Sequence, residues 1–420
     1  MPAGAEKVEL LAPAGNYEKL EIAVHYGADA VYLGDPRFSL RHFADNFTVA
    51  QMHRAAALLR AHGVKMYVAC NIFPNNREAS EIGAYLAELA ELSPDAVIIA
   101  DPGVLLTARQ TIPHIPVHLS TQANTTTLQS VRFWASQGVR RINLAREMSL
   151  AEIREITRSC AVEIEAFVHG SVCISYSGRC LLSRYLDGRD SNRGRCSHPC
   201  RWQYHLLEEQ RPGQYLPVAE DRHGTYIFNA RDLCMIDHLD QMIAAGISAL
   251  KIEGRMKSVH YLACTVKTYR EAIDAYYRAP DRYRVVDAWR RTLAAVNTRG
   301  YATHFYLGAA GAADLNDTNE KPPVQRTFVA KVLHQDETGG TRIEVRNKLF
   351  RHDRVTILRP GYPDTIDTID EIIDAQGLSL AQAQPNSVVT VRLHLSCRPH
   401  DLIQRLEGSA AGTGGHCPDE

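Results

Sequence analysis

Short apolar segments alternate with amphipathic helical patterns along the first 250 or so residues of this chain. One helical pattern spans residues 17–26, where Leu20, Ala23 and Val24 share a face. The phrases YGADAVYLG, QGVRRINLA and AGISALKIEG repeat one theme, a helix that ends at glycine and is followed by a buried strand. Eight apolar segments are interpreted as strands, at residues 8–11, 30–33, 65–70, 96–100, 117–119, 141–144, 162–168 and 248–252.

Eight parallel strands separated by helices favour a closed (β/α)8 TIM-like barrel, which we place in residues 1–313. A doubly wound open sheet has a similar content of strands and helices and stays the alternative. About eighty residues separate the seventh and eighth strands, where ~20–30 are usual. This insertion, 169–232, is rich in cysteine, and insertions at the carboxyl ends of barrel strands are where active sites form.

The pattern changes after residue 313. Residues 314–326 are polar, contain prolines and are typical of a linker. A period of two follows, with Gly339-Gly340 as a hairpin turn, and predicts a small β-barrel domain over 327–405. Its expected strands are 327–334, 341–346, 354–359 and 388–395. Residues 406–420 are rich in glycine and alanine, so we expect a disordered tail and no ligand role for Cys417.

Composition limits the class of protein. Hydrophobic residues make up 45% of the chain and its formal net charge is −1, so any contact with nucleic acid must be a local patch. No stretch approaches the ~18 apolar residues of a membrane span, and the first residues do not form a signal peptide. We therefore expect a cytoplasmic protein, whose ten cysteines need a reason other than disulfides.

Four of these cysteines, Cys173, Cys180, Cys196 and Cys200, follow the spacing Cys-x6-Cys-x15-Cys-x3-Cys. They lie among Ser, Gly and Arg in a loop-like stretch, which is unlike the setting of buried structural cysteines. Four thiolates complete a 4Fe–4S cluster, and they equally satisfy tetrahedral zinc. Structural zinc sites usually use pairs two to four residues apart, so the spacing mildly favours iron and sulfur. Cys234 is an alternative to Cys200 as the fourth ligand.

The cysteine block EAFVHGSVCISYSGRCLLS closely resembles the signature of the collagenase-like peptidase family, peptidase family U32. NRGRCSHPCRWQY, ARDLC, LKIEGRMKS and the opening ELLAPAGNYEKLEIAVHYGADAVYLG are similar to further blocks of that family, so the resemblance covers essentially the whole chain. It implies an oxygen-independent hydroxylase with a 4Fe–4S cluster. In the RNA-modifying branches it also implies prephenate as the hydroxyl donor.

By length and by the later motifs, the chain looks like the branch that makes 5-hydroxyuridine at the wobble position of tRNA. The resemblance thus implies tRNA and prephenate as partners, with hydroxylases of ribosomal RNA or of a quinone precursor as alternatives. The Cys-x3-Cys pair differs among branches, which makes Cys200 the least certain ligand. No motif identifies an electron-donor protein, if one is needed.

A peptidase is the other enzyme class considered. It needs a nucleophile with a base, or a catalytic metal with a hydrolytic water. The chain contains neither HExxH nor GxSxG, and its four clustered thiols look like ligands rather than a nucleophile. A third possibility is a non-catalytic RNA-binding partner with a structural metal.

Arginine is concentrated next to the cysteines. Between Ser171 and His205 six arginines, including Arg195 and Arg201, face two aspartates, and no lysine occurs there. Arginine suits bidentate contacts to carboxylate and phosphate, although a solvated loop of Arg–Asp pairs explains the composition as well. Residues 341–360 carry another net +4, which could form an RNA-binding face or be scattered surface charge.

Polar residues at strand ends are the remaining candidates, because barrel active sites form there. His169 follows the seventh strand and precedes Cys173 by four residues, so it is the best single candidate for moving a proton or tuning the cluster. Glu165, Lys251 and Glu253 are candidate catalytic residues too, or members of a buried ionic network that only braces the barrel. Candidate substrate-binding residues are His42, Asn46, Gln122, Asn143, Arg146, Arg195, Arg201 and Arg255.

Overall fold

The structure is a computed structural model, and it divides the chain into two compact units, residues 1–285 with 297–322 and residues 286–296 with 323–420. Within them it describes residues 7–40, 45–201, 206–207, 215–216, 219–221, 224–226, 230–297, 299–310, 314 and 326–406. For those of the described residues that lie between 201 and 229, only the backbone is described. No described helix has the length and apolarity needed to cross a bilayer.

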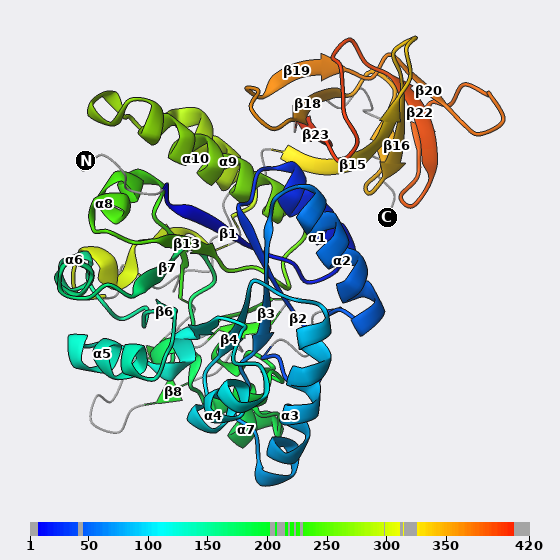
Figure 1. Cartoon of the computed structure of the whole chain (residues 1–420). Helices are drawn as coiled ribbons and strands as arrows, with labels where there is room; N and C mark the ends of the chain where they lie inside the picture. The colour runs from blue at the N-terminus through cyan, green and yellow to red at the C-terminus, as the bar shows by residue number, and fades with distance from the viewer. Residues whose placement is uncertain are drawn as a thin grey trace. The chain divides into compact units, whose positions relative to one another are not determined.

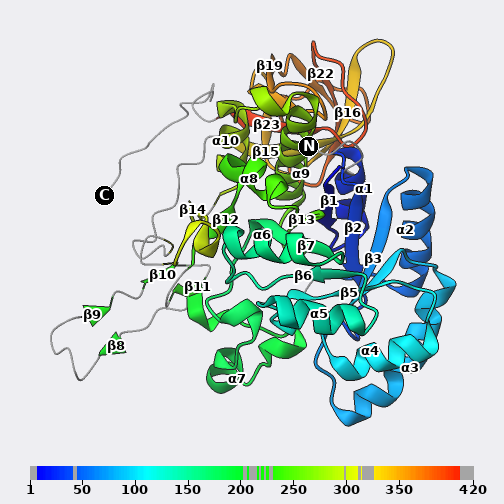
Figure 2. The same cartoon turned by 60° about the vertical axis from the view of Figure 1, so that its left-hand side comes forward.

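The first unit is a closed parallel barrel of eight strands (Figures 1 and 2). Each strand pairs in parallel with the next, and the eighth, β13, pairs with both β7 and β1, which closes the ring. Closure confirms the barrel and excludes the open doubly wound sheet. The strands are β1 (Glu9–Pro13), β2 (Ala30–Gly34), β3 (Lys65–Cys70), β4 (Ala96–Ile99), β5 (Val117–Leu119), β6 (Arg141–Asn143), β7 (Glu163–Gly170) and β13 (Ala249–Ile252).

Helices surround the barrel because each presents one apolar stripe to the strands. Side chains of the residues just before α2, α3 and α6 form capping boxes that fix where these helices begin. Gly27, Gly138 and Gly246, the glycines of the repeated phrase, have φ between +76° and +94° and turn the chain from helix to strand. The helices are α1 (Tyr17–His25), α2 (Val49–Ala61), α3 (Asn76–Glu91), α4 (Pro102–Thr111), α5 (Leu128–Ser136), α6 (Leu150–Ser159), α8 (Leu239–Ala244) and α9 (Val259–Arg278).

The insertion leaves the barrel after β7 and returns at β12 (Asp232–Cys234), which pairs antiparallel with β7 and parallel with β14 (Tyr301–Ala302). Its described part is built from short turns around one helix, α7 (Leu182–Asp187). The other short elements of this unit are η1 (Thr121–Ala123), η2 (Tyr176–Gly178), η3 (Ser191–Arg193), η4 (Pro199–Arg201), β8 (Leu206–Leu207), β9 (Tyr215–Leu216), β10 (Ala219–Asp221), β11 (Gly224–Tyr226), η5 (Ile236–His238), η6 (Pro280–Arg282) and η7 (His304–Leu307).

The second unit contains a seven-stranded antiparallel sheet with the order β19-β18-β23-β15-β16-β22-β20, together with helix α10 (Asp287–Ala294). Alternating residues such as Val355, Ile357 and Ile403 form its apolar core, and Gly339 turns the chain between β15 and β16 as expected. Its strands are β15 (Arg326–Gln335), β16 (Gly340–Val345), β17 (Leu349–Phe350), β18 (Arg354–Leu358), β19 (Thr365–Thr368), β20 (Glu371–Ile373), β21 (Gln382–Ala383), β22 (Val388–Arg392) and β23 (Leu402–Leu406).

Candidate active site at the carboxyl ends of the barrel strands

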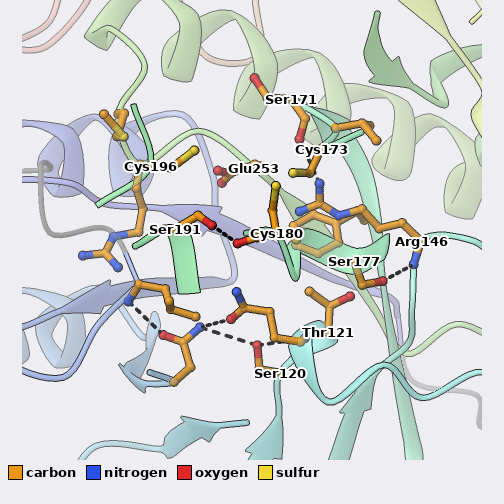
Figure 3. Close-up of a pocket in the computed structure, with 18 of the residues that line it drawn as sticks. Ser120, Thr121, Arg146, Ser171, Cys173, Ser177, Cys180, Ser191, Cys196 and Glu253 are labelled. Atoms are coloured by element: carbon orange, nitrogen blue, oxygen red, sulfur yellow. Dashed lines mark hydrogen bonds between the residues drawn. The ribbon is translucent and has the colours of Figure 1, made fainter. Parts of the chain in front are cut away.

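A cavity of about 380 Å³ lies at the carboxyl ends of the barrel strands. Tyr32, Phe167 and Lys251, from the strands themselves, contribute to its lining. Further strand residues and residues that follow strands contribute the rest of its barrel side, and the insertion closes it from another side (Figure 3). A cavity of this size lies within the range of small-molecule binding sites.

All four clustered cysteines line this cavity, and Figure 3 shows three of them, Cys173, Cys180 and Cys196. The Leu182 N–H donates to Cys180 Sγ at 3.4 Å, and the His198 N–H donates to Cys196 Sγ at 3.3 Å. Cys173 Sγ lies 2.9 Å from Ser175 Oγ. Hydrogen bonds to sulfur stabilise a thiolate, which is the form that ligates a metal.

The chemistry of this donor set fits a 4Fe–4S cluster, and it fits tetrahedral zinc as well. In the part of the chain that the structure describes, no three His, Cys, Asp or Glu side chains lie close enough together to hold one metal ion. Ligation of a single metal ion therefore requires the loops around Cys173, Cys180, Cys196 and Cys200 to draw together, as expected when metal binding and local folding are coupled.

Cys234 and His169 lie side by side on β12 and β7, and neither is among the residues that line the cavity. Burial raises the pKa of the Cys234 thiol to about 11, and Tyr269 Oη lies 3.8 Å from its sulfur. Burial also lowers the pKa of His169 to about 3, so its imidazole is neutral at ordinary pH. The rings of Tyr261, Tyr269 and Tyr301 surround it. This setting suits a bracing residue better than a proton carrier, and the catalytic role of His169 stays a prediction.

Amide and hydroxyl groups form one wall of the cavity. Asn71, directly after β3, donates to Ser120 Oγ at 3.5 Å and to Gln122 Oε1 at 3.4 Å (Figure 3). Thr121 and Asn143 also line this wall, and no hydrogen bond to the described residues satisfies either polar atom of the Asn143 amide. Asn71 was not predicted from the sequence, although Asn71, like Gln122, is a polar residue at the end of a strand.

Arg146 is the cation of this wall. Its guanidinium lies 3.9 Å from the centre of the Phe167 ring, and Nη1 donates to the Ser171 carbonyl at 2.9 Å. No carboxylate among the described residues lies within ion-pair distance of it, and its buried Nε has no hydrogen-bond partner there. A half-buried arginine held by stacking, with spare donors facing a cavity, is suited to bind an anion.

Beneath the cavity, Lys251 Nζ donates to Glu165 Oε1 at 2.8 Å, which confirms the buried ion pair. Lys251 lines the cavity, whereas Glu165 lies below it. The network continues toward the amino ends of the strands through Arg141, which lies 3.7 Å from Glu165 and 2.6 Å from Glu9. Burial raises the pKa of Glu9, but hydrogen bonds and charge from Arg141 and Lys65 outweigh this effect and lower it overall.

Glu253 and Arg255, which follow β13, both line the cavity. Tyr32 Oη donates to Glu253 Oε2 at 3.2 Å. Arg255 donates to Ser39 Oγ at 2.5 Å and to the Asn46 side chain, so Asn46 supports Arg255. Gly170, at the end of β7, allows the backbone of Glu253 to lie close to β7. It has φ +117°, and a Cβ there would lie 2.4 Å from the Glu253 carbonyl oxygen, so only glycine lets β7 and β13 approach this closely.

Four of the predicted substrate-binding residues are not placed in the cavity, and Asn46, which supports Arg255, is one of them. Arg195 is exposed and is not among the lining residues. His42 lies outside the described residues, as does the side chain of Arg201.

Comparison with known proteins shows which protein family this chain matches. The model of peptidase family U32 matches residues 15–316, and the model of the C-terminal domain of that family matches residues 325–404. The tRNA hydroxylation protein P1 of Bacillus subtilis (strain 168) is 38% identical over 402 residues, which cover 95% of each chain. The tRNA hydroxylation protein P of Escherichia coli (strain K12) is 41% identical and covers 94% of this chain and 95% of its own length. A protein named collagenase from Porphyromonas gingivalis is 28% identical over 95% of this chain and 98% of its own length.

Proposed function

This chain belongs to peptidase family U32, and on that premise we propose that it is a tRNA hydroxylase that converts the wobble uridine to 5-hydroxyuridine. The observation that carries the proposal is one cavity in which four cysteines face an arginine and a wall of amides. Relatives named for tRNA hydroxylation that match nearly the full length point to the same reaction class.

The charges of the cavity support prephenate as the hydroxyl donor. Four cations, Arg146, Lys251, Arg255 and Lys257, line it together with one carboxylate, Glu253. Lys251 pairs with Glu165 and Lys257 pairs with Asp232 beside the cavity, and the two carboxylates of prephenate suit the positive charge that remains on its lining. Arg146 is the side chain that would bind a carboxylate, since the described residues offer it no carboxylate partner.

Cys173, Cys180, Cys196 and Cys200 are the proposed ligands of a 4Fe–4S cluster, because they share the cavity and Cys234 does not line it. A cluster held there would supply one-electron transfer beside the substrates. The amides of Asn71, Gln122 and Asn143 would orient the uracil ring, whose edge presents both donors and acceptors.

Electron balance shapes the proposal. If prephenate loses carbon dioxide and hydroxide, it becomes phenylpyruvate with no net oxidation. Adding that hydroxide to C5 of uracil and releasing the C5 proton removes two electrons from the base. The two electrons must pass to an acceptor, so the balance calls for two equivalents of a one-electron acceptor per base rather than for an electron donor.

The test follows the oxygen atom. The anaerobically purified protein is given prephenate labelled with ¹⁸O at its ring hydroxyl, an anticodon stem–loop with a wobble uridine and a one-electron acceptor. The proposal expects 5-hydroxyuridine carrying ¹⁸O, together with phenylpyruvate. Label-free product would assign the oxygen to water and exclude prephenate as donor. A protein that cleaves gelatin and leaves the RNA unchanged would favour the peptidase alternative.

A further inference from the structure

Exposed apolar side chains gather on the insertion that closes the cavity. Among the described residues, five of the fourteen large hydrophobic side chains that are exposed lie within 13 consecutive positions of it. Single exposed hydrophobic residues are ordinary, but such a concentration marks a binding surface. We call this the rim patch, and its members are Ile174, Tyr176, Leu181, Tyr185 and Leu186.

The rim patch shares its segment with the cavity wall. Ser177, Gly178, Cys180 and Leu182 line the cavity, and they alternate along the chain with members of the rim patch. One short segment thus faces the site with one set of side chains and solvent with the other. Whatever covers the rim patch therefore lies next to the site.

Tyr185 is the most exposed member, with 82% of its surface open to solvent. It lies on α7, and no described side chain forms a hydrogen bond or ring contact with it. A rigid aromatic ring with open faces can stack on a planar partner at low cost in side-chain entropy.

Arginines lie in the same insertion as Tyr185. Arg184 pairs with Asp190 and Arg189 pairs with Asp187, each at 3.3 Å, and both arginine side chains are more than half exposed. Arg195 is exposed and has no ion pair within 4 Å among the described residues. Exposed pairs of this kind contribute little stability, so these guanidinium groups can turn to phosphates at little cost.

We propose that the rim patch is a platform for single-stranded RNA, on which Tyr185 stacks a base that neighbours the base held in the cavity. The inference rests on the proposed function and deepens it. A base enters a cavity only after it leaves its stack, and an aromatic ring beside the entrance replaces the stacking that its neighbour loses. Aromatic rings with arginines and no lysine fit an unpaired loop, whose bases are splayed, better than a duplex.

The experiment measures RNA binding and hydroxylation with the anaerobically purified full-length protein. The probe is an anticodon stem–loop with a wobble uridine, and a fully paired duplex of equal length is the comparison. Tyr185→Ala should raise the Kd of the stem–loop about tenfold, whereas Tyr185→Phe should keep the wild-type value. Arg195→Ala should lower the slope of log K against log salt by about one unit. Phe133→Ala, which removes an exposed aromatic from α5, is the matched control and should leave binding unchanged.

Iron content and the KM for prephenate must stay at wild-type values in Tyr185→Ala, which shows that the site itself is intact. If Tyr185→Ala binds and hydroxylates the stem–loop as the wild type does, the platform is wrong, and the rim patch would have to bind a protein instead. If the wild type binds the duplex as tightly as the stem–loop, recognition of single strands is wrong. A wild type that hydroxylates no RNA at all refutes the proposed function, a result separate from either of these.

Discussion

At the scale of single residues, Arg146 makes the sharpest prediction. Its guanidinium stacks on Phe167 and, within the described residues, has no carboxylate partner, so a substrate carboxylate would be its first ion pair. Arg146→Ala should raise the KM for prephenate about 10- to 100-fold, the loss expected for one charge-assisted hydrogen-bonded contact. Arg140→Ala is the control, because Arg140 is exposed and pairs with Glu163 at the other end of the strands. If the KM for prephenate is unchanged and the iron content is normal, Arg146 does not bind prephenate.

The buried pair of Lys251 and Glu165 makes a prediction about stability. Lys251→Met leaves Glu165 buried beside Arg141 alone, and breaking such a pair costs about 3–5 kcal/mol. Urea unfolding measures the change. The double variant Lys251→Met with Glu165→Gln should recover part of the loss, because it removes the unpaired buried charge. A single variant as stable as the wild type would show that Arg141 compensates fully.

These residues also show what the sequence could predict. Glu165 and Lys251 interrupt apolar strands, and buried charges must pair, so their ion pair was predictable. The cysteines were predictable as a group by spacing. Asn71 was not recognised although it directly follows a strand, and the burial of His169 among three tyrosines was not predictable, because Tyr261, Tyr269 and Tyr301 come from distant parts of the chain.

At the scale of elements, the join between β7 and the insertion is the critical one. Gly170→Ala would place a Cβ 2.4 Å from the Glu253 carbonyl oxygen at a φ of +117°, so β7 and β13 must separate. The loop that carries Cys173 begins at this point, and we expect the variant to retain less than half of the iron of the wild type. Gly188→Ala is the matched control. It also has positive φ, but open space surrounds its Cβ, so it should keep its iron. Full iron content in Gly170→Ala would show that the close approach of Gly170 to Glu253 is not needed to hold iron.

The eight strands of the barrel and the helix at residues 17–26 were predicted to within about two residues, because their periodicity is local. In the second unit, β19, β20 and β23 were not predicted. Their side chains alternate weakly, and Asp367 and Gln404 are buried within them as hydrogen-bonding groups. Pairing with neighbouring strands, which is not visible in local sequence, gives these segments their structure.

At the scale of the whole molecule, the charge network of the barrel links its stability to pH. Glu9 on β1 contacts Arg141 on β6 at 2.6 Å and Lys65 on β3 at 2.9 Å, so one carboxylate joins three strands of the ring. Its pKa is lowered in the folded protein despite burial. A lowered pKa means that the ionised form stabilises the fold above the unfolded pKa and that this contribution is lost as the pH falls through the folded pKa.

Glu9→Gln should therefore cost about 2–3 kcal/mol at pH 7, since it exchanges charged hydrogen bonds for neutral ones in a buried site. The difference between wild type and variant should begin to shrink as the pH falls below about 4.5, where the unfolded carboxyl takes up a proton, and it should vanish once the pH lies below the lower pKa of the folded carboxyl. Unfolding by urea at pH 7, 5 and 3.5 measures this, with the exposed Glu155→Gln on α6 as control. A difference that stays constant across this pH range would mean that shape, rather than charge, makes Glu9 important. A difference that grows toward acid would reverse the sign of its pKa shift.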